Sequence, residues 1–452
     1  MHDKPNIILI NCDDLGYGDL GCYGSRVNRT PVIDRMAAEG MRLTDFYMAS
    51  PVCSPSRGAM MTGCYPPRIG FGDFDGHWVL FPGHGIGLHP HERTIASLLK
   101  ETGYSTMLIG KWHCGDQPDF LPTRHGFDHY YGLPYSNDMG RQVGRADTMP
   151  PLPLLRDEEV IQEQPDQRSL TERYVEQAVR FIRDHKEAPF FLYFAHMHVH
   201  LPHYAPERFE RDSKNGEYGA AVECVDWSTG VLLNELKRQG LDEDTLVVFT
   251  SDNGSRADRG GSNAPLRGTK GTTWEGGQRV PCICRWPGKI PAGTVINDIV
   301  CSMDFYPTFA RLGASTVPAD RIVDGLDLVP MLLEQAPSPR TTFYFYMRNN
   351  LEAVREGQWK LHVRKGDSTM LALYDLAQDQ GEQTNLAKQH PDVVDHLQRL
   401  MATCRDDLGD DAAHVTGQNI RPAGRVEHPE TLTHYNPDHP YIIAMYDKGD
   451  AG

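Results

Sequence analysis

The sequence predicts an α/β protein in which helices cover both faces of a large, mostly parallel sheet, followed by a smaller α+β domain. Two observations predict this fold. Short apolar runs of strand length alternate with longer segments of helical periodicity over most of the chain, as repeated helix and strand units require. Beyond about residue 335 short alternating strand patterns replace them, which indicates a second, smaller unit.

The parallel part can be predicted element by element. Residues 7–10 form an apolar, β-branched run bounded by polar residues, as a buried strand should be. Thr30 and Pro31 suit the N-cap and first position of a helix that Gly40 ends. Further helix and strand pairs follow, with apolar stripes at 95–99, 174–182 and 222–236 ahead of strands at 106–109, 190–194 and 246–250.

The predicted order changes after a helix at 303–312. Strands near 343–347, 359–363 and 373–376 precede a helix near 393–404. From Gly417 the chain is rich in Pro, His, Asn and Asp, which indicates an extended tail that wraps the body or binds a partner. We therefore expect a catalytic α/β domain over residues 1–334, a small α+β domain over 335–416 and the tail over 417–452.

The charge balance excludes some classes of partner. With 45 Lys and Arg against 61 Asp and Glu, the 452-residue chain has a formal net charge of −16. This argues against a nucleic-acid partner and against an anionic membrane surface. No apolar run approaches the ~20 residues of a membrane-spanning helix. An anionic substrate stays compatible, because a bound divalent metal and a few local Arg and Lys residues can make one pocket positive.

The ten cysteines are spread along the chain, so they do not form the dense disulfide framework of a small secreted domain. Buried thiols in a reducing compartment are the simpler interpretation. The chain enters a predicted strand by Asn6, which leaves no room for a signal peptide. We expect a cytoplasmic protein. A periplasmic or secreted protein whose leader has been removed is the alternative, and a homo-oligomer is compatible with either.

The most informative motif is Cys53-Ser-Pro55-Ser-Arg57, followed by Thr62-Gly63. It places a thiol in a loop that Pro55 stiffens, with the guanidinium of Arg57 a short distance along the chain. A positive group lowers the pKa of a nearby cysteine, so these residues predict an activated nucleophile or an anion-binding loop. The alternative is that Cys53 has no chemical role and is a half-buried thiol in a Pro/Ser turn.

Polar clusters follow four predicted strands, at the edge where open α/β sheets bind ligands. Each has an ordinary explanation alone, as a helix cap, a turn or a polar loop. Their coincidence with the Cys53 motif favours one active site. The clusters are Asp13-Asp14, Lys111-Trp-His113, the histidines between His196 and His203, and Asp252-Asn253.

The residues also predict a metal site. Oxygen ligands alone suit Ca²⁺, with Mg²⁺ as the second choice. Zinc is a minority interpretation. It rests on the alternate histidines 196, 198 and 200, which would face one side of an extended segment and could together bind zinc. The residues with the predicted oxygen ligands are Asp13, Asp14, Asp252 and Asn253.

The Cys53 motif, with Thr-Gly five residues after Arg57, resembles the signature of the type I sulfatases. The likeness extends over nearly the whole chain and is greatest to the arylsulfatase A branch. In that family the cysteine is oxidised after translation to formylglycine (3-oxoalanine), whose hydrate is the nucleophile. The resemblance implies an alkaline phosphatase-like fold, a sulfuric ester hydrolase, and a formylglycine-generating enzyme as maturation partner.

The resemblance also implies residue roles. Gly-Lys111-Trp-His113 is similar to an element whose Lys and His contact the formylglycine and the sulfate, and Leu-Pro-Tyr-Ser136 to a stretch whose Ser contacts the sulfate. His200 takes the leaving-group role and Lys270 binds sulfate. The implied catalytic residues are Cys53, Arg57, Lys111, His113, His200 and Lys270, the substrate-binding residues are Ser136, Lys111, His200 and Lys270, and the metal-binding residues are Asp13, Asp14, Cys53, Asp252 and Asn253.

The leading hypothesis is hydrolysis of an aryl or carbohydrate sulfate ester through a covalent sulfo-enzyme. The metal and the local cations would stabilise sulfate charge, His200 with Lys270 would protonate the departing oxygen, and His113 would take the proton that expels sulfate. A phosphodiesterase or phosphonate monoester hydrolase on the same scaffold is the second hypothesis. A silent binding protein, whose Cys53 is never converted, is the third.

The alcohol that carries the sulfate would sit among loops. Residues 72–87, residues 140–151 and the tail are the segments expected to line its pocket. Within and beside them, Arg141, Arg145 and His84 are candidates to contact a charged sugar.

Overall fold

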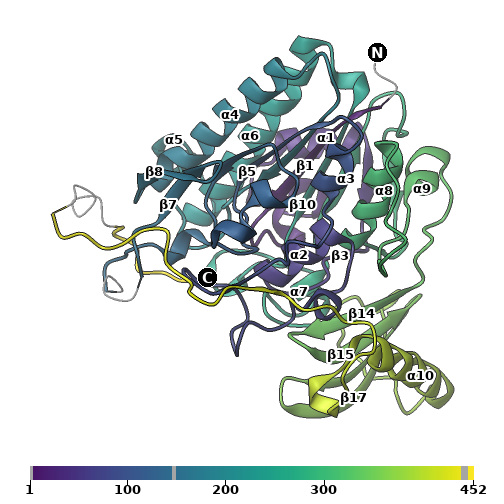
Figure 1. The fold of residues 1–452 in the computed structure, drawn as a ribbon. Helices are drawn as coiled ribbons and strands as arrows, with labels where there is room; N and C mark the ends of the chain where they lie inside the picture. Colours follow the sequence, from purple (N-terminus) through teal and green to yellow (C-terminus); the bar gives the residue numbers. More distant parts are fainter. Residues whose placement is uncertain (1–3, 145–148, 439–445) are drawn as a thin grey trace.

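The computed structural model describes residues 4–144, 149–438 and 446–452. Its centre is a ten-stranded sheet with the order β12-β2-β11-β10-β1-β9-β5-β6-β7-β8 (Figure 1). The middle strands are parallel: β10 (Thr245–Ser251), β1 (Asn6–Cys12), β9 (Phe190–Ala195), β5 (Ser105–Gly110) and β6 (His129–Gly132). Towards the edges the sheet continues with antiparallel pairs that involve β11 (Cys282–Arg285), β2 (Met41–Leu43), β7 (Pro153–Arg156) and β8 (Glu159–Glu163), while β12 (Thr294–Ile296) is parallel to β2.

Helices cover both faces of this sheet. Successive side chains of a strand point to opposite faces, and β1 divides its residues accordingly. Ile7 and Leu9 pack in one hydrophobic cluster with α3 (Ile95–Lys100) and α8 (Phe305–Leu312). The alternate residues Ile8 and Ile10 pack in a second cluster, with α1 (Pro31–Ala38), α4 (Leu170–Asp184) and α6 (Gly216–Gln239). The predicted fold class is confirmed, and its strands are continuously apolar because both of their faces are buried.

The start of α1 differs from the prediction in one respect. Pro31 is at the first helical position, but the side chain of Thr30 does not cap the helix. Instead Oδ1 of Asp226, on α6, accepts hydrogen bonds from the backbone N–H groups of Val32 (3.0 Å) and Ile33 (2.8 Å). The exposed N–H groups of a first helical turn need an acceptor, and here a distant helix supplies it.

A second, four-stranded antiparallel sheet follows the body of the protein. Its strands are β14 (Thr342–Met347), β15 (Asn350–Glu356), β16 (Trp359–Lys365) and β17 (Ser368–Asp375) in sequence order. Helix α10 (Pro391–Leu408) packs against it through residues such as Leu397 and Met401. The strand β15 has no counterpart in the prediction, because its polar and charged residues hide the alternation. The domain boundary predicted at residue 335 falls between α9 (Val329–Glu334) and β14.

A fully buried ionic cluster joins the smaller sheet to the body of the protein. Nζ of Lys360, on β16, lies 2.8 Å from Oε1 of Glu275 and 3.2 Å from Oε1 of Glu382, and all three side chains are inaccessible to solvent. Glu275 is the first residue of α7 (Glu275–Gln278) in the body. Its Oε2 accepts a hydrogen bond of 2.5 Å from Tyr47 in β3 (Phe46–Tyr47), which pairs with β13 (Val300–Cys301). One lysine therefore neutralises carboxylates from both units.

The tail returns across the body, as the yellow trace in Figure 1 shows. Its residues Gly424–Arg425 form β18 and pair with β4 (Ile86–Gly87) of the body. Further along, Tyr446 is buried, and its hydroxyl donates to the carbonyl oxygen of Pro165 at 2.7 Å. In the described parts of the chain, no helix combines the length and the apolar character needed to cross a membrane.

Candidate active site

Parallel pairing brings the predicted polar clusters to one edge of the sheet. Cys12 and Ser251 are partners at the ends of β1 and β10, so Asp13-Asp14 and Asp252-Asn253 leave the sheet side by side. The backbone N–H of Asp14 donates to Oδ1 of Asp252 at 3.2 Å. Both acidic pairs therefore border the same site, as the strand order requires.

Cys53 was expected in a loop, but it begins a helix, α2 (Cys53–Thr62). The N–H groups of the first helical turn have no intrahelical partner, so Pro55 is tolerated at the third position. Every residue of α2 is buried, and Arg57 follows Cys53 by about one turn. The helix thus fixes the thiol and the guanidinium relative to one another.

The environment of the thiol does not fit an activated thiolate. Burial raises the pKa of Cys53 to about 12, and the nearby ammonium groups of Lys111 and Lys270 offset this only in part. A thiol with such a pKa stays protonated at neutral pH and is a poor nucleophile. The expectation of an activated thiolate is therefore wrong for the unmodified side chain, because burial outweighs the effect of the nearby cations.

Three cations pair with the acidic groups. Nε of Arg57 lies 2.8 Å from Oδ2 of Asp252, and Nη2 of Arg57 lies 3.4 Å from Oδ2 of Asp13. Lys111 pairs with Asp13, and Nζ of Lys270 lies 2.9 Å from Oδ2 of Asp14. Burial disfavours the ionised form of Asp13, but Lys111, Arg57 and Lys270 oppose it and hold its pKa far below the usual range. Asp13 is therefore ionised at neutral pH.

The site gathers a group of side chains that could hold a metal ion. Atoms of Asp13, Asp14, Cys53 and His200 lie within 4.8 Å of one another. Oδ1 of Asp13 and Oδ1 of Asn253 are buried and accept no hydrogen bond from the described residues. Buried oxygens without a partner are costly, and a cation would satisfy both. Asp252 is turned towards Arg57, although it borders the cluster through its contact with Asp14.

The histidine segment does not form the alternative zinc site. In the described chain, the group of potential metal ligands includes His200 but neither His196 nor His198. Nε2 of His196 is 3.0 Å from Oγ of Ser228 on α6, away from the acidic cluster. Oxygen donors from the acidic pairs remain the better match for a metal.

The predicted substrate-binding groups are connected to the acidic cluster. Nζ of Lys111 donates to Oγ of Ser136 at 3.2 Å, and this hydroxyl lies 3.3 Å from Nδ1 of His200. Nε2 of His200 lies 3.9 Å from Oδ2 of Asp14. Burial, with Lys270 nearby, lowers the pKa of His200 to about 3, so its ring is neutral at physiological pH.

His113 is also placed in the site. Its Nε2 is 2.9 Å from the carbonyl oxygen of Leu80, while Nδ1 is buried with no hydrogen-bond partner among the described residues. Burial and then Lys111 lower the pKa of His113 well below its usual value. One nitrogen of a neutral ring is therefore held by the backbone and the other is left for a ligand.

A pocket of about 610 Å³ opens over these groups. It is lined by five of the sequence-predicted residues, Cys53, His113, Ser136, His200 and Lys270. Arg57, Lys111 and the four candidate oxygen ligands are not among its lining residues. Two further lining residues, Asp138 and Arg256, lie outside the predicted residues and segments, because nothing in their local sequence marks them.

The loops expected to line the pocket do so only in part. Residues 76–79 and 81 and the end of the tail line it, whereas none of the described residues of the 140–151 loop does. Arg141 stacks over the ring of Tyr435 at 3.6 Å, and His84 packs against Phe81 and His77. Arg145 lies outside the described residues.

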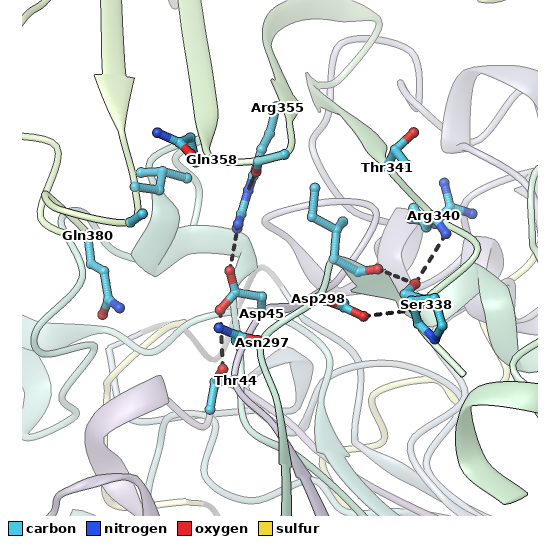
Figure 2. A pocket seen from close by; sticks show the side chains of 15 residues that line it. Thr44, Asp45, Asn297, Asp298, Ser338, Arg340, Thr341, Arg355, Gln358 and Gln380 are labelled. Atoms are coloured by element: carbon cyan, nitrogen blue, oxygen red, sulfur yellow. Dashed lines mark hydrogen bonds and ion pairs between the residues drawn. The ribbon is translucent and has the colours of Figure 1, made fainter. Parts of the chain in front are cut away.

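A second cavity, of about 550 Å³, lies at the junction with the smaller sheet (Figure 2). Its charged side chains pair with protein groups: Nη2 of Arg355 lies 2.6 Å from Oδ2 of Asp45, and Arg340 pairs with Asp304. It shares no lining residue with the Cys53 pocket. These two ion pairs therefore link the body to the smaller unit.

Comparisons with known proteins bear on both units. The family model "Sulfatase" matches residues 5–314, and the model "N-sulphoglucosamine sulphohydrolase, C-terminal" matches residues 269–407. N-acetylgalactosamine-6-sulfatase of Canis lupus familiaris is 43% identical over 376 residues, covering 79% of this chain and 71% of the relative. Arylsulfatase A of Homo sapiens is 38% identical over 445 residues, covering 88% of this chain and 87% of the relative. The solved structure of Ps i-CgsB in complex with k-i-k-neocarrahexaose has a TM-score of 0.80 at 32% identity, covering 89% of this chain and 92% of that one.

Proposed function

This chain belongs to the sulfatase family and is a sulfuric ester hydrolase, and we propose that its nucleophile is formylglycine made from Cys53. One observation carries the proposal: the side chain of residue 53 meets Asp13, Asp14 and His200 within 4.8 Å. The unmodified thiol is protonated and buried. A hydrated aldehyde at this position would supply one hydroxyl for attack and a second whose proton can be removed.

We propose that the acidic cluster holds Ca²⁺, with Mg²⁺ as the alternative. The ligands would be side-chain oxygens of Asp13, Asp14, Asp252 and Asn253, together with residue 53. A divalent cation there supplies Lewis-acid polarisation of a sulfate oxygen. The unsatisfied Oδ1 atoms of Asp13 and Asn253 support this assignment.

The cationic side chains bind and orient the sulfate group. Lys111 and Lys270 approach the same acidic cluster from different segments, and Lys270 also lines the pocket. Positive groups fixed around a sulfate stabilise the charge that moves onto its oxygens in the transition state. Ser136, held between Lys111 and His200, adds a hydroxyl donor. Arg57 keeps Asp13 and Asp252 ionised and fixed in position.

The two histidines divide the proton transfers. His200 and Lys270 line the pocket beside Cys53, where the ammonium group of Lys270 can supply a proton and the neutral ring of His200 can pass it to the departing alcohol oxygen. His113 has a free Nδ1 and lines the same pocket, so it can accept a proton from side chain 53. Its Nε2 contact with the carbonyl oxygen of Leu80 fixes the ring for that task.

We further propose that the substrate is a sulfated saccharide. Relatives named above act on, or are solved with, saccharides. In this chain the indole of Trp78 is 51% exposed on the pocket wall, where it offers a flat apolar face to a sugar ring.

Because the whole of α2 is buried, a formylglycine-generating enzyme would have to act on the Cys53 segment before it folds.

Mass spectrometry tests the nucleophile. In active enzyme, the peptide that contains Cys53 should be lighter by about 18 Da than the unmodified peptide. The variant Cys53→Ala should have no turnover, while a Cys64→Ala control keeps the motif and should retain it. Full activity with a quantitative free thiol at position 53 would refute the assignment. Parallel assays of aryl sulfate and aryl phosphate esters separate the sulfatase from a phosphodiesterase or phosphonate monoester hydrolase.

A further inference from the structure

The last residues of the described chain lie in the active-site pocket. We name residues 446–452 the C-terminal strap. Ala451 and Gly452 line the pocket together with Cys53 and Lys270. The backbone N–H of Gly452 donates to Oδ2 of Asp138 at 3.2 Å. A Cβ atom at position 452 would lie only 2.0 Å from Cε1 and 2.1 Å from Nε2 of His200. The strap therefore reaches the histidine that faces the leaving group.

The two ends of the strap are held differently. At its start, Tyr446 is buried, its hydroxyl donates to Pro165, and its carbonyl oxygen accepts from the N–H of Val143 at 2.9 Å. Lys448 adds a 2.6 Å hydrogen bond from Nζ to the carbonyl oxygen of His203. These contacts anchor the first residues firmly to the body.

Polar contacts hold the tip. Besides the hydrogen bond from Gly452 to Asp138, Nε2 of the buried Gln142 donates to the carbonyl oxygen of Asp450 at 3.3 Å. Nη1 of Arg259 lies 3.0 Å from Oδ1 of Asp450, and the two side chains are 45% and 38% exposed. Nη1 of Arg256 donates to the carbonyl oxygen of Ala451 at 3.4 Å. Solvent-exposed ion pairs contribute little to stability. The tip can therefore leave the pocket while Tyr446 stays anchored.

We propose that the C-terminal strap is a movable wall of the pocket, which covers His200 and limits the size of the alcohol that carries the sulfate. The inference rests on the proposed function, because it concerns the alcohol whose oxygen His200 protonates. That oxygen must come within hydrogen-bond distance of the ring, and Gly452 occupies one side of the ring. A narrow alcohol enters beside the strap, whereas a bulky one requires the tip to move out.

Shortening the chain tests the proposal. A variant that ends after Tyr446 is compared with the full chain on a sulfated monosaccharide and on a tetrasaccharide that carries the same sulfated sugar at an internal position. We expect the ratio of kcat/KM for the tetrasaccharide to that for the monosaccharide to rise at least tenfold. An unchanged ratio, or an equal fall for both esters, would overturn the proposal.

A second readout does not depend on turnover. In protein produced without conversion of Cys53, the rate at which iodoacetamide alkylates this thiol is followed by mass spectrometry of its peptide. We expect at least a fivefold faster rate in the shortened chain, because the strap shields the pocket. Equal rates would overturn the strap proposal. If neither chain hydrolyses either ester, the proposed function fails, whereas the alkylation rates still decide about the strap.

A matched pair of point variants controls for the shortening. Asp450→Asn removes the ion pair with Arg259 and keeps the full length. Asp438→Asn makes the same change at an exposed position of the tail outside the strap. We expect a smaller shift of the kcat/KM ratio in the same direction for Asp450→Asn, and none for Asp438→Asn. Equal shifts in both variants would overturn the assignment of the effect to the strap.

Discussion

Nζ of Lys270 lies 2.9 Å from Oδ2 of Asp14, so a lysine assigned to the sulfate also neutralises a carboxylate assigned to the metal. Burial raises the pKa of Asp14, and Lys270 is the main group that opposes this rise. In turn, burial disfavours the charged form of Lys270, but Asp14 outweighs it and raises the lysine's pKa. The two charges are therefore interdependent, which makes Lys270 a sensitive position for substitution.

Replacing Lys270 by methionine should lower kcat/KM by about 10²–10³, because the transition state loses a fixed positive group beside the sulfate. Steady-state kinetics on a sulfate ester would measure this loss. Lys289→Met, at an exposed position, is the matched control and should have the activity of the unchanged protein. A threefold difference in kcat/KM corresponds to about 0.7 kcal/mol of transition-state stabilisation. If the activity of Lys270→Met stayed within threefold of the control, Lys270 would not bind the sulfate.

Lys360→Met should destabilise the fold by about 3–5 kcal/mol, because it leaves Glu275 and Glu382 buried without their shared cation. Chemical denaturation, followed by circular dichroism, would measure the free energy of unfolding. The exposed Lys388→Met serves as control in the same unit of the protein. A loss below about 1 kcal/mol would mean that the ionic cluster does not join the smaller sheet to the body as inferred.

The parts of the fold that could be predicted are those that a single segment encodes. The central strands are apolar throughout because both faces are buried, so residues 7–10 already identify β1. The cap of α1 could not be predicted, since Asp226 is almost two hundred positions away and the nearby Thr30 has the side chain expected of a cap. Strand β15 was missed because charged residues such as Glu352 and Arg355 lie in it, paired with the body.

The same distinction applies to the site. Asp13, Cys53 and Asp252 were identified because each occurs in a local motif at the end of a strand or the start of a helix. The helical conformation of Cys53 was not predicted, because Pro55 suits both a rigid loop and a first helical turn. The segments that contain Trp78 and the end of the tail were expected at the pocket, but which of their residues reach it could not be predicted, since only the folded chain brings them there.

The stability of the fold should depend on the titration of Lys365. Burial, with Lys360 nearby, lowers the pKa of Lys365 from 10.5 to about 7. Between these two values the unfolded chain binds the proton and the folded chain does not, so stability rises with pH across this window. We expect the free energy of unfolding, relative to Lys365→Met, to rise by roughly 3 kcal/mol from pH 7 to pH 10.

Denaturation curves at several pH values would measure this difference, with Lys289→Met as the exposed control. A difference between the natural chain and Lys365→Met that does not change with pH would contradict the prediction. A decrease with rising pH would mean that the folded state favours the charged form of Lys365.

Metal removal should abolish turnover and lower the melting temperature, and Ca²⁺ should restore both. The reason lies in the oxygens of Asp13 and Asn253, which have no hydrogen-bond partner among the described residues and are the proposed ligands of the cation. At a calcium concentration of about 100 Kd, binding adds about 2.7 kcal/mol of stability, which thermal unfolding detects without any assay of activity. Asp13→Asn should lose most of this calcium-dependent gain because it removes a charged ligand, whereas the exposed Asp320→Asn should keep it. If Asp13→Asn gained as much stability from Ca²⁺ as the natural chain, the cation would have to bind elsewhere, and the acidic pairs at the ends of β1 and β10 would serve only to balance the charges of Arg57, Lys111 and Lys270.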